Sequence, residues 1–262
     1  MRGVYEIAEW RNALNELREH IKGHTIDMEE DVFKILEHSY IRLNDENLQE
    51  CLLYCTLFPE DYKIRRVSLI KYWIAVGLVE EMGTRQAELD RGHAILNKLE
   101  DVCLLERCEN GKCVKMHDVI RDMAINISTK NSRFMVKAGR LLRDIPSEIK
   151  WSENLERVSL MDCQHQTWIS VPNCPKLTTL FLQSGTGVYE VLNACFANMQ
   201  GLKVLDWSYT NISFLPDSIS DLVNLRALFL CHCEELNHVP SLAKLKGFEG
   251  VGSKWGCSGS ST

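Results

Sequence analysis

A leucine pattern that recurs along the second half of the chain limits the possible folds more than any other feature. The pattern is Leu-x-x-Leu-x-Leu, with valine or tryptophan replacing one leucine in two of its four copies. The copies begin at Leu155, Leu177, Leu202 and Leu225, so the steps between them are 22, 25 and 23 residues. Periods of about 20–29 residues are typical of solenoids whose repeats each supply one short strand. We therefore predict a short curved solenoid over residues 141–245, with a parallel sheet on its concave side.

The same period predicts which side chains point into the solenoid. Leu155, Leu180, Leu205 and Leu228 should be buried, because the inward leucines of one strand stack on those of the next. Residues between the inward positions should form the concave face, and such faces commonly bind protein. The candidates for this face are Arg157, Ser159, Thr179, Phe181, Lys203, Asp206, Arg226 and Phe229.

The first half of the chain has the period of α-helices instead. Apolar residues recur there every three or four positions, which predicts amphipathic helices. The dipeptide Asn110-Gly111 interrupts this pattern, and it favours the positive φ angles of a tight hairpin turn. A last apolar face, from Met116 to Ile127, follows the hairpin. Several helices, a hairpin and another helix are the order of elements in a winged-helix domain. The helices predicted before the hairpin cover residues 5–21, 32–43, 48–58, 67–76 and 85–101.

Composition and charge argue against several functions. The 30 Lys and Arg residues are outnumbered by 36 Asp and Glu residues, for a formal net charge of −6, whereas nucleic-acid-binding domains are usually basic. The chain has no apolar run of about 18 residues, and its start, MRGVYEIAEW, lacks the apolar stretch of a signal peptide. We therefore expect an intracellular protein with no transmembrane segment, in which most of the eleven cysteines are buried thiols.

No motif in the sequence predicts catalysis or metal binding. Cys108, Cys113 and His117 lie near one another in the chain, but they lack the paired C-x2-C spacing that a closed zinc site prefers. There is no G-x-S-x-G, no H-E-x-x-H and no pair of carboxylates that marks a catalytic cleft. The prediction is a protein that is not an enzyme and holds no metal.

Several stretches are similar to motifs of one family. CLLYCTLFPEDY at 51–62 is similar to the motif that opens a winged-helix subdomain, and LIKYWIAVGLV at 69–79 and GHAILNKLEDVCLLE at 92–106 resemble the two segments after it. VKMHDVIRDMA contains an MHD motif, and CPKLTTLFLQ and LKVLDWSYT fit early repeats. In this order, the stretches resemble the plant disease-resistance proteins of the coiled-coil nucleotide-binding leucine-rich-repeat (NB-ARC/LRR) family, over residues 5–245.

The resemblance implies a multidomain α+β fold, in which a helical and winged-helix part precedes a short leucine-rich-repeat solenoid. It also implies a fragment or the product of a truncated gene, because the P-loop NTPase domain and the coiled coil of the family are not found. A faint likeness to a P-loop at 247–254 ends in Ser-Lys, which is the wrong order. The implied domains are the C-terminal part of a helical NB-ARC subdomain at 1–30, the winged-helix domain at 31–135, the repeats at 141–245, and a flexible Gly/Ser-rich tail at 246–262.

The resemblance also assigns a role to His117. In the family, the imidazole at this position contacts the β-phosphate of ADP in the resting state, the residue matching Asp118 orients the motif, and the one matching Met116 packs in the core. A histidine at a helix start adds a donor near amides that already favour an anion. From spacing alone another interpretation stays open, in which Asp118 merely caps the helix and His117 is solvated. We expect ADP or ATP in an intact family member, and weak or no binding by this chain alone.

Partners and location follow from the same resemblance. The repeats are expected to recognise a protein, either a pathogen effector or a guarded host protein, while an NTPase domain would be an intramolecular partner in full-length relatives. The expected location is the cytoplasm or the inner surface of the plasma membrane. One alternative is a repeat module with no nucleotide switch. The other is a DNA-binding winged helix, which charge disfavours because the helix at 85–101 carries Arg85, Arg91 and Lys98 against Glu88, Asp90, Glu100 and Asp101.

Overall fold

The chain forms two compact units in the computed structural model. Among the described residues, the first unit comprises 28–56, 60–71 and 78–127, and the second comprises 57–59, 72–77 and those from 128 onward. The helix predicted over 5–21 lies outside the described residues. The structure describes residues 28–130, 132–138, 151–162, 166–168, 172–184, 189–191, 194–245 and 251–252.

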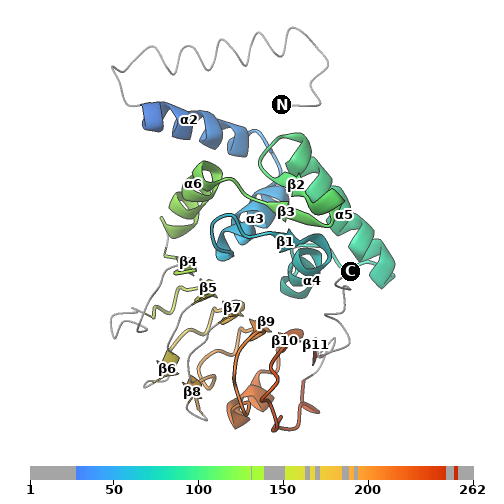
Figure 1. Ribbon diagram of the computed structural model, residues 1–262, viewed down its shortest axis with the longest axis vertical. Helices are drawn as coiled ribbons and strands as arrows, with labels where there is room; N and C mark the ends of the chain where they lie inside the picture. The colour runs from blue at the N-terminus through green and yellow to red at the C-terminus, as the bar shows by residue number, and fades with distance from the viewer. Residues whose placement is uncertain are drawn as a thin grey trace. The chain divides into compact units, whose positions relative to one another are not determined.

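Helices make up most of the first unit, and two of them start at polar caps. Asp45 and Thr84 each accept amides of the following first turn, which satisfies donors that have no partner inside a helix. The helices are α2 (Met28–Ile41), α3 (Glu46–Tyr54), α4 (Arg66–Val76), α5 (Arg85–Asp101) and α6 (Asp118–Thr129), with a short 3-10 turn η1 (Cys55–Leu57) after α3 (Figure 1). The bounds of α5 match the predicted helix at 85–101. Residues 66–71 of α4 belong to the first unit and residues 72–76 to the second.

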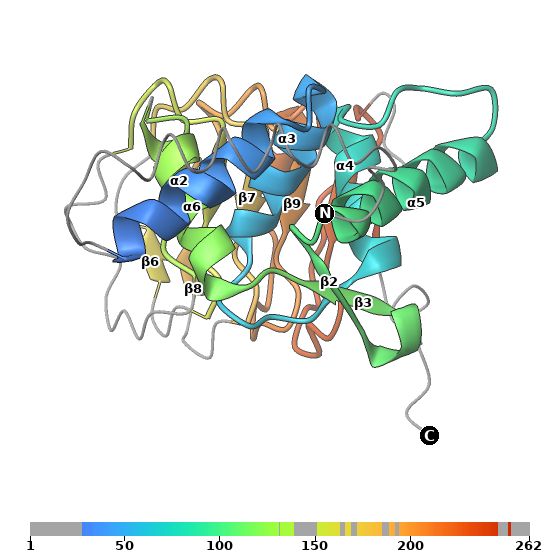
Figure 2. The same cartoon turned by 90° about the horizontal axis from the view of Figure 1, so that it is seen from above.

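A small antiparallel sheet of order β1-β3-β2 completes the first unit. Strands β2 (Glu106–Cys108) and β3 (Cys113–Lys115) form the predicted hairpin (Figure 2). Strand β1 (Ile64–Arg65) pairs with the other side of β3. Asn110 and Gly111 have φ angles of 53° and 82°, so both adopt the positive φ that the dipeptide favours. Because α6 follows this hairpin, the winged-helix order of elements is confirmed.

The core of the first unit is dense where α4 meets α5. Leu69 and Ile70 of α4 and Leu96 and Leu99 of α5 are completely buried. Gly92 lies against Ile70 so closely that a Cβ atom built on the glycine would come within 2.3 Å of the isoleucine Cγ2. The missing side chain at this position therefore allows the two helices to approach.

Short parallel strands form the sheet of the second unit, in the order β11-β10-β9-β7-β5-β4 (Figure 1). Leu155, Leu180, Leu205 and Leu228 are 3%, 0%, 0% and 0% exposed, which confirms the predicted phase of the repeats. A separate pair of parallel strands is formed by β6 (Gln166–Trp168) and β8 (Tyr189–Val191). The strands of the main sheet are β4 (Phe134–Val136), β5 (Arg157–Ser159), β7 (Thr179–Phe181), β9 (Val204–Asp206), β10 (Ala227–Phe229) and β11 (Val251–Gly252).

The main sheet extends beyond the predicted repeats at both ends. β4 begins before residue 141, and β11 lies inside the segment that was predicted to be a flexible tail. Both strands pair in parallel with the neighbouring repeat strand. The leucine pattern could not reveal them, because adding a strand at the edge of a sheet requires backbone hydrogen bonds but no inward leucine.

Each repeat turns with the same unusual backbone conformation. Asp162, Ser184, Tyr209 and His232 have φ angles of 60°, 60°, 60° and 56°, and each lies two residues after the last inward residue of its repeat. Non-glycine residues rarely adopt positive φ. The positive φ at this turn is therefore imposed by the geometry of the repeat, because none of the four residues is a glycine.

Candidate functional site

The start of α6 brings together the three residues of the Met-His-Asp motif. Met116 is 4% exposed and anchors the end of β3 in the core, whereas the His117 side chain is 65% exposed. The carbonyl of His117 accepts the Arg121 amide at 2.9 Å, so the histidine is the capping residue and Asp118 is the first residue of the helix. The motif thus places an exposed imidazole at the amino end of a helix.

The carboxylate of Asp118 fixes the imidazole of His117. One of its oxygens pairs with Nδ1 of His117 and also accepts the Val119 amide at 2.7 Å. Because Nδ1 faces the carboxylate, Nε2 is the ring nitrogen left to meet a ligand. In the imidazolium form, Nε2 carries a proton that it can donate to an anionic oxygen.

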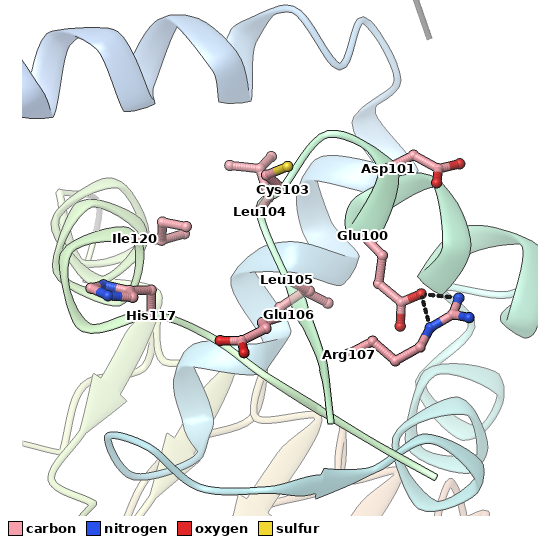
Figure 3. A pocket seen from close by; sticks show the side chains of 9 residues that line it. All are labelled: Glu100, Asp101, Cys103, Leu104, Leu105, Glu106, Arg107, His117 and Ile120. Atoms are coloured by element: carbon pink, nitrogen blue, oxygen red, sulfur yellow. Dashed lines mark hydrogen bonds and ion pairs between the residues drawn. The ribbon is translucent and has the colours of Figure 1, made fainter. Parts of the chain in front are cut away.

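His117 lies on one wall of a pocket of about 650 Å³ in the first unit. Figure 3 shows His117 and Ile120 on the side of α6, and the ion pair of Glu100 with Arg107 on the opposite side, with Leu105 and Glu106 between them. The nine lining residues are Glu100, Asp101, Cys103, Leu104, Leu105, Glu106, Arg107, His117 and Ile120. Three carboxylates line this space, so a free phosphate would meet more negative than positive charge inside it.

A partly buried ionic network supports the wall opposite His117. Glu100 pairs with Arg66 at the start of α4 and with Arg107 of β2, and both guanidinium groups also donate to the Asn97 side-chain oxygen, at 2.8 and 3.2 Å. The side chains of Arg66 and Glu100 are 7% and 8% exposed. Sequence reasoning missed this network, because Arg66 and Glu100 are 34 residues apart and no local pattern connects them.

Several of the predicted concave-face residues contact other parts of the second unit. Arg157, Ser159, Thr179, Phe181 and Asp206 are buried, so in this structure they are not available to an external protein. The Arg157 guanidinium lies 4.7 Å from the ring centroid of Phe134, Phe181 contacts Phe58 and Tyr72, and Asp206 accepts the Tyr72 hydroxyl. Phe229 is half-buried.

Two of the predicted face residues are out of register. Lys203 is half-buried and Arg226 is exposed, and each precedes its strand by one residue. Val204 and Ala227 occupy the equivalent positions, in line with Thr179 of β7. The assignment was wrong because two residues separate the first and second leucines of the pattern, and only the second of them lies on the strand.

The cysteines are distributed largely as expected. Cys51, Cys55, Cys113, Cys174 and Cys195 are buried free thiols, Cys108 and Cys233 are half-buried, and Cys103 is exposed; Cys231, by contrast, is disulfide-bonded. Cys108 and Cys113 face each other across the hairpin. Within the part of the chain that the structure describes, no three His, Cys, Asp or Glu side chains are grouped to hold a metal ion. Nor is any described helix long and apolar enough to cross a membrane.

Comparison with known proteins agrees with this architecture. The family model described as "Disease resistance protein Winged helix domain" matches residues 57–124, and the leucine-rich-repeat model matches residues 175–234. The putative disease resistance protein At4g10780 of Arabidopsis thaliana is 37% identical over 238 residues, covering 88% of this chain and 26% of its own length. From the same plant, disease resistance protein SUMM2 is 38% identical (86% of this chain, 25% of its own length), and disease resistance protein RPS5 is 37% identical (84% and 25%).

The chain therefore spans about a quarter of the length of these relatives. The similarity covers both units, since the winged-helix match lies mainly in the first and the repeat match lies in the second. The chain carries a winged-helix domain of the disease-resistance type and leucine-rich repeats, and over most of its length it is similar to plant disease-resistance proteins.

Proposed function

We propose that this chain is the nucleotide-sensing and early recognition part of a plant disease-resistance receptor. It acts by regulation and recognition, not by catalysis. The observation that supports this most directly is the position of His117, an exposed imidazole at the amino end of α6 whose Nδ1 is paired with Asp118. Met116, buried in the core, fixes where that helix begins.

In this proposal, His117 contacts the phosphate of an ADP molecule held by an NTPase domain. The pocket beside His117 is lined by Glu100, Asp101 and Glu106, so its charge does not suit a phosphate bound within it. A contact at the rim, by a nucleotide that another domain carries, fits the exposed imidazole better. A hydrogen bond to a charged group contributes about 1.5–3 kcal/mol, which is enough to bias a two-state switch by a factor of ten or more.

The repeats supply recognition of a protein partner in this proposal. The concave strand positions described above are largely covered, so a partner of this chain would use the exposed positions, which include Arg226 and Tyr209. A pathogen effector or a guarded host protein is the proposed class of partner.

Titration of ADP tests the nucleotide part of the proposal. The 262-residue chain alone should bind ADP weakly or not at all, whereas a longer receptor that includes the NTPase domain should retain ADP. In that receptor, His117→Ala should increase the ADP dissociation rate by about tenfold or more. The control is His93→Ala, a half-buried histidine of α5 that does not line the pocket.

Equal ADP retention by the His117→Ala receptor and the wild type would contradict the proposed role of His117. The helix-cap interpretation would then stand. If partner binding by the repeats also showed no dependence on nucleotide, the chain would be a repeat module without a switch.

A further inference from the structure

One tyrosine fits between equivalent positions of three consecutive repeats in the second unit. Phe181 of β7, Asp206 of β9 and Phe229 of β10 are partners in the register of the parallel sheet. The ring of Tyr72 contacts both phenylalanines, with centroid distances of 5.0 Å to Phe181 and 4.7 Å to Phe229. Two aromatic walls with a carboxyl group between them therefore surround the tyrosine.

We call Phe181, Asp206 and Phe229 the socket of Tyr72. Between its two phenylalanines lies the buried carboxyl group of Asp206, whose hydrogen-bond partners are uncharged groups. The Tyr72 hydroxyl and the Gln183 amide nitrogen donate to one oxygen of Asp206, and the Ser208 amide donates to the other at 3.0 Å. Asp206 is 1% exposed and Tyr72 is 4% exposed. Burial raises the pKa of the Asp206 carboxyl, although the hydrogen bonds from Tyr72, Ser208 and Gln183 oppose this in part.

The cations on the neighbouring strands bind elsewhere. Lys203, which directly precedes β9, donates to the backbone carbonyl of Val76 in α4 at 3.1 Å. Burial, together with the charge of Arg226 in the next repeat, lowers the pKa of Lys203. Arg157 belongs to β5, two strands away, where it lies over a phenylalanine ring. From α4, the titratable group that faces Asp206 is the Tyr72 hydroxyl. Among the described residues, the groups that act on the Asp206 carboxyl are therefore hydrogen-bond donors without a positive charge.

We propose that Phe181, Asp206 and Phe229 form a proton-linked socket for Tyr72, which holds the segment Tyr72–Gly77 on the repeats more tightly when Asp206 is protonated. The aromatic walls favour a phenol ring at any pH. The carboxyl makes the strength of this binding depend on pH. This inference is independent of the nucleotide proposed above.

The sign of the pH dependence follows from the direction of the shift. When the segment is released, Asp206 becomes exposed and its pKa returns toward the ordinary value of 3.8. Docking is thus strongest below that pH and weakens as the pH rises through the raised pKa of the docked state. Between the two values, the docked state holds one more proton than the released state, so the docking constant falls by up to about tenfold per pH unit.

Hydrogen exchange measured by mass spectrometry on the 262-residue chain tests the proposal. After correction for the intrinsic exchange rates, protection of the segment Tyr72–Gly77 should decrease in the wild type as the pH rises from about 4, near the ordinary carboxyl pKa, to 8. Asp206→Asn keeps the shape but cannot ionise, so its protection should not vary with pH and should exceed that of the wild type at pH 8. The matched control is Asp221→Asn, an exposed carboxyl paired with Lys244, which should behave like the wild type. A wild-type pH slope that persists in Asp206→Asn would overturn the proposal.

A second variant, Tyr72→Phe, tests the proton linkage if Asp206→Asn does not fold. Tyr72→Phe keeps the ring between the two phenylalanines but removes the hydroxyl donor that stabilises the ionised carboxylate. Its loss of protection relative to the wild type should therefore be larger at pH 8, about tenfold or more, than at about pH 4, where Asp206 is protonated in the docked state. An equal loss at both pH values would show that Tyr72 binds through packing alone and that the socket is not linked to a proton.

Discussion

Arg66, the first residue of α4, is paired with Glu100 near the end of α5, and both side chains are more than nine-tenths buried. Buried charges are tolerated in proteins when each has a partner of opposite sign and further hydrogen bonds. Arg107 and Asn97 supply those further bonds here. The pair therefore connects α4, α5 and the hairpin at the pocket wall opposite His117.

Replacing Glu100 should destabilise the first unit severely. Glu100→Gln keeps the size of the side chain but leaves Arg66 buried without a counter-charge, which should cost about 3–5 kcal/mol of unfolding free energy. Urea denaturation measures this loss. The control is Glu109→Gln, because the Lys63–Glu109 ion pair is exposed and its loss should have a much smaller effect. Similar losses in the two variants would contradict the structural role assigned to the buried pair.

A methyl group at Gly92 should force α4 and α5 apart. Gly92→Ala places its Cβ against Ile70, whose nearest atoms lie close to the backbone and cannot swing away. We expect a net loss of about 1–3 kcal/mol, since overpacking outweighs the better helix propensity of alanine. Thermal unfolding should show no comparable change for Gly83→Ala, where the added Cβ meets open space. The cost of Gly92→Ala should also shrink in an Ile70→Ala background, and an undiminished cost there would refute the clash.

Removing a leucine from the repeat core should weaken the second unit. Leu205 is completely buried within the continuous core of the repeats. Leu205→Ala should therefore cost about 2–5 kcal/mol through lost burial and the cavity left behind. Val223→Ala removes an apolar side chain that is 51% exposed and should be nearly neutral in the same denaturation experiment. A large effect of Val223→Ala would indicate that the assigned core is wrong.

Thiol labelling should separate the cysteines by burial. Burial raises the pKa of Cys195 to about 12 and that of Cys55 still further, so neither forms the reactive thiolate at pH 8. Cys103 is exposed. With iodoacetamide at pH 8 and mass spectrometry as the readout, Cys103 should be alkylated in the native protein before the other cysteines that the structure describes, and Cys55 and Cys195 only after unfolding. Early labelling of Cys195 would contradict its placement in the repeat core.

The parts of the fold that could be predicted are those that repeat or are encoded locally. The burial of Leu155, Leu180, Leu205 and Leu228 could be predicted because the same leucine pattern recurs in each of the four repeats. The bounds of α5 follow from a threonine cap and one apolar face, and the hairpin follows from Asn110-Gly111. Each of these signals lies within a few residues of the structure that it specifies.

Contacts between distant segments could not be predicted in the same way. Tyr72 and Asp206 are 134 residues apart, and helical periodicity shows that Tyr72 lies near an apolar face without showing what covers it. For that reason the sequence predicts that Phe181 and Asp206 face a partner protein. In the structure, Tyr72 of the same chain contacts both residues. The Arg66–Glu100 ion pair could not be predicted either, because its two residues are 34 positions apart in the chain. The position of His117 was easier to anticipate, because the spacing of Met116 from Val119 and Ile120 fixes the buried face of α6.

The recurring turn at Asp162, Ser184, Tyr209 and His232 has an evolutionary consequence. An acid, a small hydroxyl, a phenol and an imidazole all occupy this position with the same backbone conformation, and their side chains are exposed or half-buried. Tyr209 and His232 even stack on each other, at 4.7 Å between ring centroids, without disturbing the strands beside them. Substitutions along this edge therefore cost the solenoid little, and the edge can diversify in chemistry from one descendant gene to the next while the leucine core stays the same.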